Sequence, residues 1–343
     1  MHAHRILSAA AMAAALIATI ATTASAQSAA TFYKGKTVTL VIPAGSGGSY
    51  GRYGLLGKAA LEKFMPGTTV VLQFMPGSGG VKAANYIYNA AAKDGSVIVN
   101  ITATIAQTQL FKPKNVHYQA NKFPYIGQYS PLPSLIAVWN DAPALTITDA
   151  KKKVVVLGAT GVGSQQYQIP TLLNKLISTK FKVINGYKGS RRIFHAIENK
   201  EVQGAVASTV SWATIKPGWV ETKKVIPMFQ LGLKAAKGYE KVPLIEDVTS
   251  NPQHRQMLRA ASTGAPMGRS MAAVPGIPKD RLQMLRAAFK EGMHDKEMLK
   301  KAKKLKLPVE YHSGEELEAM SREIMKTPKS LVDQVKKLLK VKG

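Results

Sequence analysis

The feature that most constrains this chain is a recurring order of apolar strand, glycine-rich loop and helix. Residues 36–42 (KTVTLVI) are apolar and β-branched, which predicts a buried strand. A glycine-rich loop at residues 44–51 follows, and then a helix to about residue 64. Residues 68–74 begin a second such unit, and residues 96–101 predict the next strand. Short connections between alternating strands and helices indicate an α/β fold with parallel strands.

The same order returns in the second half of the chain, after an aromatic and proline-rich stretch at residues 118–133. Its predicted strands are short and apolar: residues 135–139, 154–157, 182–184, 204–208 and 225–231. We therefore predict two α/β lobes with a ligand cleft between them and two chain crossings. Residues 27–134 and 260–343 are predicted to form lobe 1, and residues 135–259 to form lobe 2.

Helices are predicted to close the chain. Residues 278–293 carry an apolar stripe at helical spacing. Ser313 and Glu316 have the spacing of a capping box, which predicts a helix that starts at Ser313. Thr327 before Pro328 predicts another start, with Thr327 as the N-cap and Pro328 as the first helical residue.

The N-terminus has the pattern of a secretory signal. Arg5 precedes an apolar run at residues 6–20, and Ala24-Ser25-Ala26 ends it with the small residues that a signal peptidase reads. We predict a signal peptide over residues 1–26, cleaved near Ala26, and an exported mature chain that is not inserted in the membrane. The chain has no cysteine, which excludes disulfides and thiolate metal sites.

The chain is strongly basic, with 47 Lys and Arg against 20 Asp and Glu and a net charge of +27. Most lysines stand singly or in pairs at helical spacing, which is typical of a solvated helix face. They are not accompanied by an aromatic stacking motif, and the chain is exported, so we predict no nucleic-acid partner. The positive field would attract anionic ligands or the membrane face, while a general lysine bias explains it equally well.

Three glycine-rich loops share one design, because each follows a predicted strand and precedes a predicted helix. They are Gly45-Ser46-Gly47-Gly48-Ser49, Gly77-Ser78-Gly79-Gly80 and Thr160-Gly161-Val162-Gly163-Ser164. Glycine allows the backbone to approach a ligand closely, and a helix start presents free N–H groups and a positive dipole end. Such a site binds an anion without a charged side chain. Glycine also makes tight turns, but three such loops divided between two lobes favour anion binding.

The sequence does not support a phosphate or nucleotide ligand. Tyr50 and Lys82 stand where a dinucleotide fingerprint has its third glycine. Gly57-Lys58 lacks the earlier glycine of a P-loop. Carboxylate is the remaining common small anion, and we predict no cofactor. The histidines of the mature chain are isolated, with none at H-x-x-x-H spacing, so we also predict no metal site.

Residues 47–51 (GGSYG) also match the G-x-S-x-G motif of serine hydrolases. A hydrolase would need an acid and then a histidine downstream, such as Asp247 with His254 or His294. The motif follows the first strand of the mature chain rather than a strand in mid-sheet, and an HGGG-type segment does not precede it. We keep a hydrolase as an alternative and predict no catalytic residues.

Several long segments, in the right order, resemble the Bug-type periplasmic binding proteins of tripartite tricarboxylate transporters. The resemblance runs from Phe32 to Leu339 and is strongest in VTLVIPAGSGGSYGRYGLL, VVLQFMPGSGGVKAANYIYNAAAKDGSVI, LGATGVGSQQYQIPTLLNKLISTKFKVINGYKGS and VPGIPKDRLQMLRAAF. It implies a type II periplasmic-binding-protein fold that closes on a small di-, tri- or aromatic carboxylate. It further implies a monomeric, non-enzymatic protein of the periplasm that hands its ligand to membrane transporter subunits, with docking on a sensory receptor as the alternative.

The resemblance also implies a ligand site. The family's glycine loops hold a ligand carboxylate, partly through ordered waters, and further contacts come from the facing sides of the cleft. The residues implied here are Ser46, Gly47, Gly48, Ser49, Tyr50, Pro76, Gly77, Ser78, Gly79, Thr102, Thr104, Thr160, Gly161, Gly163, Ser164, Tyr187 and Ser208.

One part of the first loop departs from the family's pattern. Gly51 and Leu55 stand where the family usually has an aspartate and an arginine, and Arg52 lies beside the missing acid. An aspartate there would favour ligands with an ammonium or hydroxyl group. Its loss predicts a preference for purely anionic or aromatic carboxylates.

Overall fold

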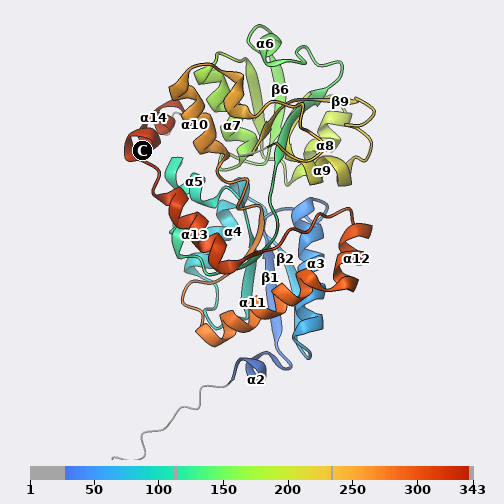
Figure 1. Ribbon diagram of the computed structural model, residues 1–343, viewed down its shortest axis with the longest axis vertical. Coiled ribbons are helices and arrows are strands. Elements are labelled where there is room, and N and C mark those ends of the chain that lie inside the picture. Colours follow the sequence, from blue (N-terminus) through green and yellow to red (C-terminus); the bar gives the residue numbers. More distant parts are fainter. Residues whose placement is uncertain (1–27, 112–113, 233–234, 340–343) are drawn as a thin grey trace, which may run out of the picture.

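The computed structural model describes residues 28–111, 114–232 and 235–339, and its ribbon shows two lobes stacked one on the other (Figure 1). The predicted signal peptide, residues 1–26, lies outside the described residues. Within these ranges, no helix is long and apolar enough to cross a membrane. The described strands form a sheet of six in lobe 1 and a sheet of five in lobe 2.

The sheet of lobe 1 is mixed. In spatial order its strands are β11 (His312–Ser313), β4 (Tyr125–Ser130), β10 (Arg269–Ala273), β3 (Val97–Ile101), β1 (Thr37–Ile42) and β2 (Thr69–Phe74). β1 runs parallel to β2 and β3, as the strand–loop–helix order predicts, whereas β10 and β11 run antiparallel to their neighbours. The loops after the three parallel strands therefore meet at one edge of the sheet, where α/β proteins bind ligands.

Helices cover both faces of this sheet. One face packs on α3 (Ser49–Phe64) and α11 (Lys279–His294), and the other on α4 (Val81–Asn89) and α13 (Gly314–Met325). The remaining helices of this lobe are α2 (Ala29–Tyr33), η1 (Ser78–Gly80), α5 (Ile105–Phe111), η2 (Ala120–Lys122) and α12 (Lys296–Lys304).

The sheet of lobe 2 is also mixed and also covered on both faces. Its strands are β7 (Phe181–Asn185), β6 (Val155–Ala159), β8 (Gly204–Ser208), β5 (Ser134–Trp139) and β9 (Val225–Leu231). β6 runs parallel to β7 and β8, and β5 runs antiparallel to β8 and β9. Its helices are α6 (Ile147–Ala150), α7 (Gln165–Leu176), α8 (Ser190–Glu198), α9 (Thr209–Ile215), η3 (Ile245–Val248) and α10 (Pro252–Ser262), and α14 (Lys329–Leu338) is the last helix of the described chain.

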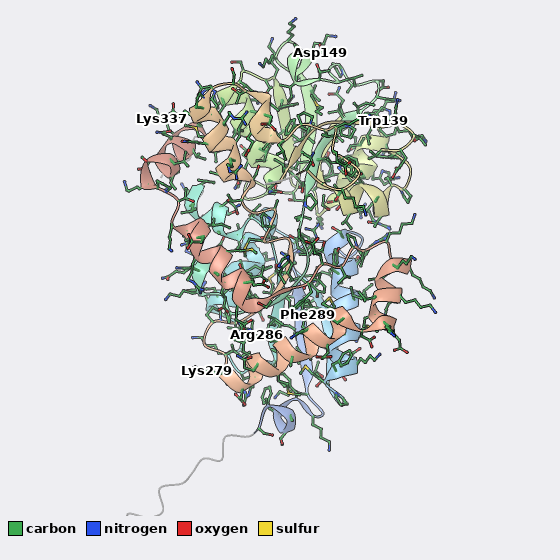
Figure 2. All side chains as sticks on the ribbon, in the orientation of Figure 1. Trp139, Asp149, Lys279, Arg286, Phe289 and Lys337 are labelled. Atoms are coloured by element: carbon green, nitrogen blue, oxygen red, sulfur yellow. The ribbon has the colours of Figure 1, made fainter. Side chains whose placement is uncertain are left out.

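The sequence does not predict three strands of lobe 1, which are β4, β10 and the two-residue β11, or the helices α2, α5, α6, α9, α10 and α12. Every residue of β4 (YIGQYS) and of β10 (RSMAA) is buried, so neither strand shows an alternation of polar and apolar residues. Polar side chains fill part of this core. Tyr129 of β4 packs against Phe289 of α11, which Figure 2 labels, with 4.8 Å between the ring centroids.

The two predicted helix starts near the C-terminus have different outcomes. Ser313 and Glu316 form the predicted capping box at the start of α13. The prediction for Thr327 is wrong, because Pro328 is the N-cap of α14. The Thr327 hydroxyl instead donates to the carbonyl of Ile324 at 2.6 Å, so it satisfies the end of α13.

The last helix packs where the two lobes meet. The apolar face of α14 is buried in the same cluster as α7 and α10 of lobe 2 and α5 of lobe 1, and Figure 1 shows α14 beside α10. The chain reaches α14 directly from α13, between Met325 and Lys329. We propose that residues 329–339 bridge the two lobes, and the predicted lobe boundaries stay a proposal.

Candidate functional site

A cavity of about 120 Å³ lies between the lobes. Most of the predicted site residues line it, namely Gly48, Ser49, Tyr50, Pro76, Gly77, Gly79, Thr102, Thr104, Thr160, Ser164, Tyr187 and Ser208. The other predicted residues lie in the same loops but not on the cavity wall: Ser46, Gly47, Ser78, Gly161 and Gly163. A Cβ atom on Gly163 would come within 2.6 Å of the Ser78 carbonyl oxygen, so these two loops pack directly on each other.

Helix starts from both lobes converge on the cavity. Its wall includes Ser49, the first residue of α3, and the N-caps of three helices of lobe 2: Ser164 of α7, Gly189 of α8 and Ser208 of α9. A helix start has unpaired N–H groups and the positive end of the helix dipole. Together these helix starts favour an anion in the cavity.

Arg269, the first residue of β10, adds a buried guanidinium to the cavity wall. The residue is only 4% exposed. Its Nη2 atom donates to the Ser49 hydroxyl at 2.6 Å and to the Ser208 hydroxyl at 3.3 Å, and its Cζ atom lies 3.9 Å from the centre of the Tyr50 ring. Its Nε and Nη1 atoms have no hydrogen-bond partner within the described residues. A buried cation is destabilising unless an anion or a full set of acceptors accompanies it, so this wall favours an anionic ligand.

Four side chains connect the lobes around this guanidinium. The Ser49 hydroxyl lies 3.1 Å from that of Ser211, which lies 2.8 Å from that of Ser208. With the two contacts of Arg269, the hydroxyls close a ring in which Ser49 and Arg269 come from lobe 1, and Ser208 and Ser211 from lobe 2. Because the Arg269 guanidinium is hydrogen-bonded to serines of both lobes, its position depends on how the lobes are placed relative to each other.

The rims of the cavity touch. The Gly45 N–H of lobe 1 donates to the Lys188 carbonyl of lobe 2 at 2.9 Å. The Thr108 hydroxyl of α5 donates to the Gly163 carbonyl, also at 2.9 Å. These two hydrogen bonds connect the lobes beside the cavity.

Sequence reasoning missed the wall residues with polar or charged side chains outside the predicted set: Ser134, Gln165, Gln166, Lys188, Ser190, Ser211 and Arg269. The glycine loops need no charged side chain to bind an anion, but the structure adds Arg269 to this wall. One signal in the sequence was available. Arg269 is a single cation directly before the uncharged stretch SMAAV, and a charge at the head of a buried strand is unusual.

The described wall residues do not include the acid and histidine that a serine hydrolase would need. Among the described residues that line the cavity there is neither a histidine nor a carboxylate, and the Ser49 hydroxyl contacts Arg269 and Ser211 instead. Arg52 does not line the cavity. A Cβ atom on Gly51 would collide with the Ser46 carbonyl, so this backbone leaves no room for an aspartate there.

Two tyrosines add neutral polar groups. The Tyr50 hydroxyl accepts a hydrogen bond from the Ala103 N–H at 3.3 Å. Burial, and then the nearby charge of Glu201, raises the pKa of Tyr187 above its ordinary value of 10.0. Tyr187 is therefore a neutral phenol at physiological pH, able to donate a hydrogen bond to a ligand oxygen.

A comparison with protein-family models finds no match, and neither does a comparison with curated proteins. Solved structures do match. The periplasmic binding protein BugD is 19% identical with a TM-score of 0.70, and the match covers 88% of this chain and 97% of that one. MatC from Rhodopseudomonas palustris, with bound malate, is 19% identical with a TM-score of 0.68, over 89% and 99% of the two chains. Rpa4515 from R. palustris, with adipate, is 18% identical with a TM-score of 0.68, over 89% and 97%. The chain thus has the two-lobed α/β fold of these periplasmic binding proteins, which confirms the fold predicted from its sequence.

Proposed function

We propose that this chain is a periplasmic solute-binding protein that captures a small carboxylate and delivers it to the membrane subunits of a tripartite tricarboxylate-type transporter. The observation that carries the proposal is the composition of the cavity wall between the lobes. Within the described residues this wall holds the buried cation Arg269, several helix starts and no acidic side chain. Such a wall stabilises an anion and repels a cation.

A carboxylate suits this wall better than other small anions. A planar guanidinium matches the geometry of a carboxylate, and the serine hydroxyls around Arg269 can donate to the same oxygens. MatC and Rpa4515 hold malate and adipate in the same fold. We extend this ligand class, small di-, tri- or aromatic carboxylates, to the present chain.

Binding without catalysis is supported by the surroundings of Ser49. A nucleophilic serine needs a base within hydrogen-bond reach, and the Ser49 hydroxyl instead accepts a hydrogen bond from the cation Arg269. A neighbouring cation cannot remove the hydroxyl proton. The G-x-S-x-G match at residues 47–51 is therefore better explained as a glycine loop that leads into α3.

The test is a melting screen of the purified protein against malate, adipate, citrate and benzoate, with malamide as the uncharged control. A ligand at about 100 times its Kd stabilises the folded state by about 2.7 kcal/mol, which raises the Tm by a few degrees. We expect at least one carboxylate to raise the Tm and malamide to leave it unchanged. If all four carboxylates leave the Tm unchanged, while the protein turns over an ester and Ser49→Ala stops this, the binding proposal is wrong.

Delivery to a transporter needs a separate test. We expect cells that lack this chain to take up the identified ligand more slowly, and the wild-type chain to restore uptake. Unchanged uptake in such cells would contradict delivery and would favour the sensing alternative.

A further inference from the structure

We propose that Arg269 determines the specificity of the cavity, so that acids with anionic groups alone are accepted and acids with an ammonium group are rejected. This inference rests on the proposed function, because it names the acids that the same cavity takes. It assigns the selection to a strand residue of lobe 1 that lies outside the glycine loops.

The first step is the charge on the wall. The lining residues within the described ranges include two cations, Arg269 and Lys188. Lys188 is exposed to water, which screens its charge, and its carbonyl takes part in the contact with Gly45. Arg269 is buried, so its charge acts on a ligand with little screening. The fixed charge that a ligand meets inside the cavity is therefore positive.

The second step is the rigidity of this charge. Arg269 lies in the middle of the sheet, since β10 pairs with β3 on one side and β4 on the other. The Ser49 and Ser208 hydroxyls hold Nη2, and the Tyr50 ring packs on the guanidinium plane. The side chain thus cannot easily turn away to reach solvent or a carboxylate elsewhere. A cation fixed in this way gives specificity because it is already in place before the ligand arrives.

The third step concerns whether the cavity wall can bind an ammonium group of a ligand. An ammonium only donates hydrogen bonds, so it needs acceptors and preferably a carboxylate. The described wall residues offer hydroxyls, amides and carbonyls but no carboxylate, and Arg269 repels a second cation. Malate and aspartate differ only in a hydroxyl or an ammonium on one carbon. The cavity should therefore separate these two acids by charge.

Gln165 provides a neutral counterpart on the facing wall. It begins α7 in lobe 2, is only 8% exposed, and its Nε2 atom has no hydrogen-bond partner within the described residues. Its amide can hydrogen-bond a polar group of the ligand, but it carries no charge. Removing Gln165 should weaken the binding of both acids alike, so Gln165→Leu is a matched control for Arg269→Gln.

The experiment measures Kd by calorimetry for malate and aspartate, and for adipate and 6-aminohexanoate, with wild type, Arg269→Gln, Arg269→Lys and Gln165→Leu. We expect wild type to bind the diacid of at least one pair on the order of 30-fold or more tightly than its ammonium analogue. Arg269→Gln should lose most of this ratio. Arg269→Lys, which keeps the charge, should retain the ratio with a weaker absolute affinity, and Gln165→Leu should leave the ratio unchanged.

The ratio separates a specificity role from a structural one. If Arg269 only holds the serine ring together, Arg269→Gln will weaken both acids of a pair by the same factor, and the inference is overturned. It is also overturned if wild type, in every pair that it binds, binds the ammonium acid as tightly as the diacid. If wild type binds neither these acids nor any acid of the melting screen, the proposed function itself fails. That outcome differs from a failure of the Arg269 inference alone, in which acids bind but without the expected ratio.

Discussion

At the residue scale, Arg269 shows how a polar core is arranged around one charge. Removing a guanidinium from water is unfavourable by several kcal/mol, and the described contacts offset only part of this. Two serine hydroxyls and one aromatic face surround it, all of them neutral. The part of this desolvation free energy that the neutral contacts do not offset can be offset by a ligand, because an anion in the cavity pairs with the guanidinium. The closed form is therefore more stable with an anion bound than without one.

A second residue, Asp94, permits a prediction about acid. Burial is the largest single effect and raises the pKa of Asp94. The hydrogen bonds from the Ser96 hydroxyl at 2.6 Å and the Ser96 N–H at 2.9 Å, together with the charges of Lys36 and Arg281, outweigh it, so the pKa lies below its ordinary value of 3.8. A depressed pKa adds stability above the ordinary pKa, and this stability is lost as the pH falls through the folded-state pKa. We expect Asp94→Asn to lower the urea midpoint at pH 7 more than at pH 3.

The control for this prediction is Asp141→Asn, which removes only an exposed ion pair with Lys200. An exposed pair contributes little, so the midpoint should change little at either pH. Equal losses for Asp94→Asn at pH 7 and pH 3 would contradict the assigned pKa shift.

Residues of the site differ in how far the sequence reveals them. The glycine loops are local patterns, because strand, loop and helix follow each other within a few residues. Arg269 is different, since its partners Ser49 and Ser208 lie 220 and 61 residues away along the chain. No spacing rule connects these positions, and only the folded sheet brings them together.

At the scale of elements, α13 and α14 start in different ways, and this leads to a matched prediction. Ser313→Ala removes a side-chain cap from the N3 backbone of α13, which typically lowers stability by about 0.5–2 kcal/mol. Thr327→Ala removes a hydroxyl that caps nothing in α14, so we expect a smaller loss. Chemical denaturation of both variants measures the difference, and equal losses would contradict the assignment of the two caps.

Strands made of apolar or small residues were predictable even where they are fully buried, whereas buried strands that carry polar residues were not. β1, β2, β8 and β9 are rich in apolar or small residues and lie within a residue of their predicted bounds. β4 and β10 place tyrosine, glutamine, serine and arginine in the centre of the sheet. Some of their polar groups bond with tertiary partners, as the Tyr129 hydroxyl does with the amide oxygen of Asn100 at 3.1 Å, and such partners are not visible in a local pattern.

At the scale of the whole molecule, Gly79 controls how closely the lobes approach. It has φ +69, and a Cβ atom there would lie 2.6 Å from the backbone nitrogen of Ser164 on the other lobe. Gly35 has φ +73 and nothing within 4 Å of its Cβ position. Gly79→Ala and Gly35→Ala therefore introduce the same backbone strain, of order 1 kcal/mol, but only Gly79→Ala obstructs closure.

We expect both variants to melt at a lower temperature than wild type. With a ligand from the melting screen present, small-angle scattering should show wild type and Gly35→Ala becoming more compact, and Gly79→Ala failing to do so. Normal compaction and affinity in Gly79→Ala would show that this contact does not limit closure.

The position of α14 has a mechanical consequence. Its apolar face packs on α5 of lobe 1 and on α7 and α10 of lobe 2, at the edge of the molecule in Figure 1. Sliding or twisting of one lobe past the other would separate α14 from one side of this cluster and expose apolar surface to water, which is unfavourable. A hinge rotation about this edge disturbs the cluster least, so we expect the lobes to open and close about α14.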